Sequence, residues 1–176
     1  MGVGKSTQGK LLATSLGLPQ LSMDQVRWDY YREIGYDAER QRAIGENEGF
    51  AGIYRYWKPF EAHAVERLLA DHHDCVIDFG AGHSVFEDAG LFERVRRAVA
   101  PFSNVVLLLP SPDPEESLRI LHTRRGGSPP PGEFDVNAHF IRHHSNYDLA
   151  KIVVYTEGKT PEETRDSILS AIAERT

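Results

Sequence analysis

The chain has 176 residues, a length that fits one domain with a hydrophobic core. It is 40% hydrophobic and 26% charged, as in ordinary globular proteins, and its net charge of −6 argues against a nucleic-acid-binding surface. A single cysteine excludes an intramolecular disulfide, and the sequence shows neither a signal peptide nor an apolar run of membrane-spanning length. We therefore expect a cytoplasmic protein, monomeric or weakly dimeric, that binds neither nucleic acid nor membrane.

The first residues contain the end of a phosphate-binding loop, whose full pattern is G-x-x-x-x-G-K-[ST]. Successive N–H groups of such a loop cradle phosphate oxygens, and the helix that follows adds its positive N-terminal end. We expect Gly2, Gly4, Lys5, Ser6 and Thr7 to bind ATP. Lys5 would reach the outer phosphates during catalysis, and the Ser6 hydroxyl would hold Mg²⁺.

The first glycine of this pattern, and the buried strand that normally leads into it, would fall before Met1. We expect the first strand of the sheet to be missing from the numbered chain because the start is set too late or truncated. Loss of a core strand is the alternative. It would leave buried backbone groups unpaired, at about 1–3 kcal/mol for each group.

Apolar spacing predicts a helix over 5–16, ended by a glycine, and a short strand over 18–22. A second helix is expected over 24–34, where apolar residues recur every four positions. Residues 35–50 are polar and rich in glycine, which favours a loop or a short helix over the substrate side.

An apolar stripe of helical period follows over 53–69, and Pro59 predicts that a helix kinks or begins there. Continuous apolar runs at 75–78, 104–109 and 151–155 predict buried strands. Strands of this type that alternate with helices indicate a parallel sheet covered on both faces. We predict an α/β fold with a three-layer, doubly wound parallel sheet, of the P-loop type found in small-molecule and nucleotide kinases.

Three helix starts carry a capping residue followed three positions later by a glutamate, as in a capping box. These pairs are Ser84 with Glu87, Asp113 with Glu116, and Thr160 with Glu163. Proline directly follows the second and third capping residues, at the first helical position. We interpret all three glutamates as capping residues.

Two acids and one loop are further candidates for the active site. Asp24 follows a strand near the phosphate loop, where ligands bind in open α/β sheets, so we expect it to bind the acceptor and act in catalysis. Helix capping is its alternative role. Asp78 ends an apolar strand, like the acid that holds Mg²⁺ in other P-loop proteins; a solvated strand end is an equally open interpretation.

The loop 124–134, rich in glycine and proline, predicts a lid in which Arg124 and Arg125 neutralise phosphate charge; a linker is the alternative.

We interpret the adjacent histidine pairs and the tyrosines as structural residues, not as metal or substrate ligands. The adjacent pairs His72-His73 and His143-His144 lack the i, i+4 spacing of helical metal ligands, so we interpret them as surface residues. Tyrosines at 30, 31, 54 and 56 could line a pocket, but aromatic stripes belong more often to the core.

A phosphate loop alone does not distinguish a GTPase, an ATPase motor and a small kinase. The sequence has no guanine-reading N-K-x-D motif and is shorter than most motors. We therefore favour a small-molecule or nucleotide kinase.

Among such kinases, the sequence resembles the shikimate kinase family over nearly its whole length. Four motifs carry this resemblance: the P-loop from Gly4, Asp24 as the second acid of D-x-D, Trp57-Lys58-Pro59-Phe60-Glu61 for F-R-x-x-E, and Gly80-Ala81-Gly82 for G-G-G. Arg142 matches the arginine of a later R-x-x-x-Y, and Arg124 or Arg125 matches the lid arginine. The resemblance implies ATP and Mg²⁺ as cofactors and a substrate site of Asp24, Lys58, Gly80, Gly82 and Arg142.

Departures from the family pattern lie on the acceptor side, at Ser22, Lys58 and Ala81. Lysine at position 58 lacks the forked contact that an arginine makes with a carboxylate. We predict one kinase domain over 1–176, with an acceptor segment at about 25–60, which transfers the γ-phosphate of ATP to an alcohol group of a small metabolite other than shikimate. A nucleoside or nucleotide kinase, or a nucleotide-binding module without turnover, remains the alternative.

Overall fold

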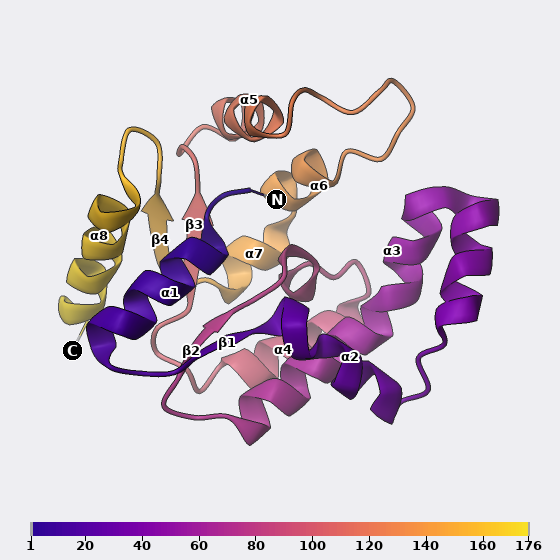
Figure 1. Cartoon of the computed structure of the whole chain (residues 1–176), viewed down its shortest axis with the longest axis horizontal. Helices are drawn as coiled ribbons and strands as arrows, with labels where there is room; N and C mark the ends of the chain where they lie inside the picture. Colours follow the sequence, from indigo (N-terminus) through magenta and orange to yellow (C-terminus); the bar gives the residue numbers. More distant parts are fainter. Residues whose placement is uncertain (1, 176) are drawn as a thin grey trace.

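The computed structural model describes residues 2–175, so Met1 and Thr176, the ends of the predicted domain, lie outside the described part. Helices and strands alternate along the chain (Figure 1). In order they are α1 (Lys5–Leu16), β1 (Gln20–Ser22), α2 (Met23–Glu33), α3 (Ala38–Asp71), β2 (Val76–Asp78), the 3₁₀ helix η1 (Ala81–Ser84), α4 (Ala89–Val99), β3 (Val106–Leu109), α5 (Pro114–Arg124), α6 (Val136–Arg142), α7 (His144–Leu149), β4 (Ile152–Tyr155) and α8 (Pro161–Ala173).

The strands form two parallel pairs. Strand β1 pairs with β2, with Leu21 opposite Ile77, and β3 pairs with β4, with Leu108 opposite Val154. Within residues 2–175 no strand joins β2 to β3, and a cavity of about 410 Å³ is lined by residues of both. The fold is therefore mixed α/β with small parallel sheets, an arrangement compatible with a P-loop kinase.

The two largest hydrophobic clusters of the described residues pack against the two strand pairs. The larger joins α2, α3 and α4 around the fully buried side chains of Tyr31, Leu68 and Val95. In the second, Leu108 and Ile168 pack together, joining β3 and α8 to α1 and β4. Figure 1 accordingly shows α1 and α8 beside β3 and β4, and α2 with α4 below the other strand pair. None of the helices described here combines the length and the apolar character needed to cross a membrane.

The segment 35–50 is more helical than the sequence suggested. Helix α3 already begins at Ala38, because the Asp37 carboxylate accepts hydrogen bonds from two backbone N–H groups of the first turn. The helix is interrupted at Gly49, whose φ of 63° is left-handed, and not at Pro59, which lies inside the helix. The expected break was therefore assigned to the wrong residue: glycine adopts a left-handed conformation at little cost, whereas the proline is accommodated in the helix.

The capping predictions had mixed outcomes. Thr160 and Glu163 form a complete capping box at α8, and Asp113 caps α5. Ser84, however, ends η1, and α4 begins later, capped by Asp88. The capping roles of Glu87 and Glu116 were also wrong.

Both glutamates bind other side chains. Glu116 pairs with Arg119 one turn along α5, and Glu87 accepts hydrogen bonds from Tyr54 and His139. In each case another side chain binds the carboxylate in place of the backbone N–H group: Arg119 for Glu116, and Tyr54 with His139 for Glu87. The local capping pattern does not reveal such partners.

Candidate active site

The phosphate loop has the backbone geometry of an anion cradle. Gly2 and Gly4 have φ values of 98° and 94°, in the left-handed region that favours glycine. Helix α1 begins directly after Gly4, and no side chain of the described residues caps it or places an acid in its first turn. The N-terminal end of α1 can therefore bind an anion from solution. Ser6 and Thr7 lie exposed on its first turn. These residues fit the phosphates of ATP.

Lys5 lies between this loop and two carboxylates. Burial lowers the pKa of Lys5, while Asp24 and Asp78 both act to raise it. The three residues come from different elements: α1, the start of α2 and the end of β2. Pairing of β1 with β2 brings them together, because Ser22, next to α2, lies opposite Asp78.

Asp78 is held in one orientation by its neighbours on β1. Its Oδ2 accepts a hydrogen bond from Gln20 Nε2 at 2.6 Å, and its Oδ1 accepts one from Ser22 Oγ at 2.8 Å. Each carboxylate oxygen has two lone pairs, so both retain the capacity to accept another ligand. Oxygen donors of this kind suit Mg²⁺, directly or through water. Ser22, a departure from the family pattern, thus orients the acid.

Asp24 lies in the first turn of α2 with 59% of its side chain exposed. The alternative role of helix cap is not what the structure shows, because no side-chain hydrogen bond caps α2. Its carboxylate lies against the loop after β2: a Cβ atom added at Gly80 would be 2.3 Å from Asp24 Oδ1. A side chain at position 80 would displace the Asp24 carboxylate, so the two predicted acceptor residues lie side by side.

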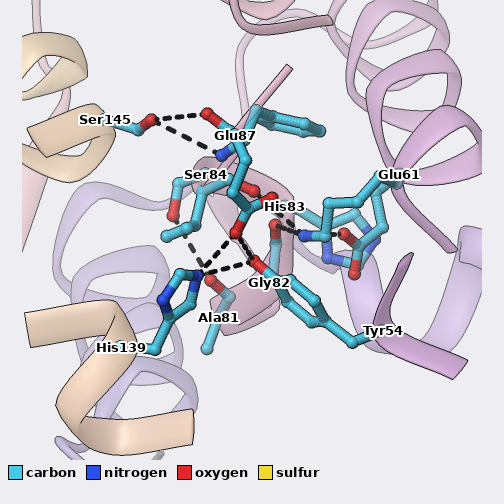
Figure 2. Close-up of polar contacts among 12 residues, drawn as sticks. Tyr54, Glu61, Ala81, Gly82, His83, Ser84, Glu87, His139 and Ser145 are labelled. Atoms are coloured by element: carbon cyan, nitrogen blue, oxygen red, sulfur yellow. Dashed lines mark hydrogen bonds and ion pairs between the residues drawn. The ribbon is translucent and has the colours of Figure 1, made fainter. Parts of the chain in front are cut away.

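Lys58 is occupied by protein groups. Its Nζ donates to the carbonyl oxygens of Gly82, at 3.0 Å, and Val85, at 2.9 Å, and forms an ion pair with Glu61. The side chains of Lys58 and Glu61 are only 7% and 3% exposed. Burial lowers the pKa of Lys58 and raises that of Glu61, and each charge opposes the shift of the other. Lys58 thus fixes the loop of η1 to α3, and Figure 2 shows Glu61 next to His83 of η1.

Two residues near Asp24, Arg27 and His83, had no role in the sequence prediction. The guanidinium of Arg27 lies 4.4 Å from the ring centre of Trp28, and its Nε is buried without a hydrogen-bond partner among the described residues. Its Nη1 lies 3.8 Å from Asp24 Oδ1. The i, i+3 spacing of Asp24 and Arg27 could have revealed this pair, since such residues share a helix face.

His83 and Tyr31 form the buried floor behind Gly80. The Tyr31 hydroxyl lies 3.3 Å from His83 Nε2. Burial lowers the pKa of His83 to about 3, and the positive charge of Arg27 adds to the shift. Burial likewise raises the pKa of Tyr31. Both side chains are therefore neutral near pH 7. The sequence analysis interpreted Tyr31 as a core tyrosine, whereas no local motif pointed to His83.

The predicted lid and Arg142 lie in different surroundings. Arg124 Nη1 donates to the carbonyl oxygen of Gly2 at 3.2 Å, so the structure brings this arginine to the phosphate loop. Arg125 is the exposed residue that ends α5. Arg142 is also exposed, and its guanidinium is engaged 2.6 Å from Glu115 on α5. In the described chain Arg142 thus has a protein partner outside the group around Asp24.

A glycine cradle at a helix N-terminus, a half-buried lysine and two converging carboxylates define a P-loop phosphotransferase. Comparison with known proteins narrows this class. The shikimate kinase family model matches residues 1–173. A shikimate kinase from Streptomyces coelicolor is 33% identical over 184 residues, covering 98% of this chain and 91% of that protein. The chain therefore belongs to the shikimate kinase family, whose members are ATP-binding P-loop kinases that phosphorylate a small metabolite.

Proposed function

We propose that this protein transfers the γ-phosphate of ATP to a hydroxyl group of a small, hydroxylated metabolite. The observation that carries the proposal is the convergence of Lys5, Asp24 and Asp78 at the N-terminal end of α1, with Asp24 against Gly80. This arrangement leaves a phosphate cradle on one side of Lys5 and an exposed carboxylate on the other. An acceptor hydroxyl held by Asp24 would then face the phosphate.

Each residue has a role that follows from its position. Lys5 and Arg124 neutralise charge on the transferred group, with Arg125 as a second lid cation. Asp24 orients the acceptor hydroxyl and takes its proton late in the transfer. Ser6 and Asp78 are the residues that would hold Mg²⁺, which supplies charge neutralisation at the β- and γ-phosphates. Most of the rate then comes from positioning and electrostatics.

We further propose that the acceptor differs from shikimate. Lys58, which matches the family's carboxylate-binding arginine, is bound to Glu61 and to two carbonyl oxygens, so a substrate acid would have to displace them. Arg27 offers a guanidinium next to Asp24 instead. A hydroxylated acid whose anionic group lies nearer α2 fits this arrangement, and so does a sugar-like polyol that needs no anion site.

The strand arrangement is also proposed to be part of a larger sheet. Strands β2 and β3 both line one apolar cavity, together with Leu12 of α1 and Ile168 of α8. A further parallel strand at that position would pair both inner edges and complete a three-layer, doubly wound sheet.

ADP release by the purified protein with ATP, Mg²⁺ and a panel of hydroxylated acids, polyols, nucleosides and shikimate tests the proposal. We expect turnover with a non-nucleoside acceptor and a kcat/KM for shikimate below about 10⁴ M⁻¹s⁻¹, the lower end of ordinary enzymes. A higher value would show that shikimate is the acceptor after all. Tight ATP binding without ADP release for every acceptor would instead indicate a binding module.

A further inference from the structure

Three side chains with metal-binding atoms lie together between η1 and α6. Glu87 follows η1, His139 lies on α6, and His143 ends α6. One ligand atom from each lies within 4.8 Å of the other two. The two histidines are four residues apart, the spacing that places two ligands on one helix face. The sequence prediction examined only adjacent histidines and so overlooked this pair.

The carboxylate of Glu87 is already directed at this group. His139 Nε2 lies 2.6 Å from Glu87 Oε1, and the Tyr54 hydroxyl donates to the same oxygen at 2.8 Å. Figure 2 shows Tyr54 and His139 approaching Glu87 from opposite elements, α3 and α6. The side chains of Glu87 and His139 are 46% and 24% exposed, so an ion can reach them from solvent.

We propose that Glu87, His139 and His143 form a binding site for a divalent transition-metal ion of the Zn²⁺ type. One carboxylate and two imidazoles are a common donor set for Zn²⁺, and a water molecule would complete four-coordination. Mg²⁺, which prefers oxygen donors and strict octahedral geometry, fits this set poorly. The site is separate from the residues proposed for phosphoryl transfer and does not depend on that function.

Metal binding would change one local contact. His143 Nδ1 accepts a hydrogen bond of 3.2 Å from the backbone N–H of Ser145 at the start of α7. When Nε2 coordinates the ion, the ring proton lies on Nδ1, so Nδ1 no longer accepts this hydrogen bond. The bond to the metal would then hold the His143 ring in its place. The ion would in return fasten α6 to the segment between η1 and α4. The rings of Phe134, at the end of the predicted lid, and His139 are 5.3 Å apart, so the ion would also steady the base of the lid.

Calorimetric titration of Zn²⁺ into the untagged, nucleotide-free full chain tests the site. We expect one ion per chain, with binding weakened at least about tenfold in His139→Ala and in His143→Ala. His144→Ala is the matched control, because His144 stacks on His143 but pairs with Asp148. This control should bind Zn²⁺ like the parent.

The proposal would be overturned if no Zn²⁺ binds, or if binding survives both histidine substitutions. Equal weakening by His144→Ala would point to a general effect of surface imidazoles. If circular dichroism shows that an alanine variant is unfolded, Glu87→Gln takes its place in the titration, since this change retains the side-chain shape and removes the charge. Mg²⁺ titrated under the same conditions should bind at least about tenfold more weakly than Zn²⁺ at this site.

Discussion

The two sides of the proposed active site are built in different ways. The phosphate side is built on one continuous segment, in which the left-handed glycines and first turn of α1 present backbone groups, and Arg124 reaches this segment from the end of α5. The acceptor side combines three separate elements, α2, α3 and η1, which are held together by aromatic packing and the buried pair of Lys58 and Glu61. The first depends on backbone conformation and the second on side-chain packing.

This difference explains why one side keeps its family pattern and the other does not. A backbone cradle requires glycine at fixed positions, and any phosphate ligand satisfies it. The ligand of a side-chain site depends on the partners of its charged groups, and in this chain Lys58 is paired with Glu61. Variants on each side should therefore behave differently: phosphate-side changes should abolish the reaction, and acceptor-side changes should alter the acceptor or the stability.

The largest effect is expected for Lys5→Ala. Loss of this cation should lower phosphoryl transfer by about 10³-fold or more, because a charge near the transferred group is lost. The free energy of unfolding should change little, since Lys5 packs at the cradle and burial already disfavours its charge. Lys10→Ala, an exposed lysine on the same helix, is the control and should retain turnover. Near-normal activity in Lys5→Ala would refute the phosphate-loop assignment.

Asp24→Asn should lower kcat by about 10²-fold, the range of general acid–base groups, with little change in ATP affinity. The substitution retains the shape of the side chain beside Gly80 but removes its charge. Steady-state kinetics with the acceptor found in the panel, and ATP binding by calorimetry, measure the two quantities. Asp29→Asn on the same helix is the matched control. A variant with unchanged kcat would mean that Asp24 does not contact the acceptor.

The buried His83 gives the acceptor side a distinctive pH dependence. Its pKa of about 3 lies below the ordinary 6.5, so between these values the unfolded chain binds a proton that the folded protein excludes. The free energy of unfolding is highest above about pH 6.5 and should fall by about 2 kcal/mol between pH 7 and pH 5. Chemical denaturation at each pH measures this slope. His83→Gln should flatten it, whereas His73→Gln, an exposed control, should not. An unchanged slope in His83→Gln would contradict the assignment.

The sequence predicted those features that local patterns determine. Helix α1, the four strands and the capping box at Thr160 follow from apolar spacing and capping residues within a few positions. It failed where a distant partner decided the outcome. Glu87 had the spacing of a capping residue, but Tyr54 and His139, from other helices, bind its carboxylate. No local pattern could reveal that competition.

The same limit applies to the candidate site. Asp24 and Gly80 were predicted from a strand end and a motif, and the structure places them together. Lys58 was predicted to hold a substrate acid, yet its contacts with Glu61 and two carbonyl oxygens depend on how α3 packs against η1. The spacing of Arg27 and Asp24 suits an ion pair on one helix face, but the burial of Arg27 Nε and its position over the ring of Trp28 depend on tertiary packing.

The smallest expected effect concerns the segment 124–134, which belongs to the phosphate side although it is far away in the sequence. Arg124 reaches the carbonyl oxygen of Gly2, so the phosphates of a bound nucleotide would offer it a stronger, charged partner. A non-hydrolysable ATP analogue should therefore slow proteolysis within 124–134 several-fold, as ordering of a loop removes the extended conformers that proteases cut. Arg124→Gln should lose this protection. Arg119→Gln, which removes an exposed arginine of α5 paired with Glu116, should keep it. Equal cleavage of the parent protein with and without the analogue would identify the segment as a plain linker, and the phosphate side would then consist of α1 and its loop alone.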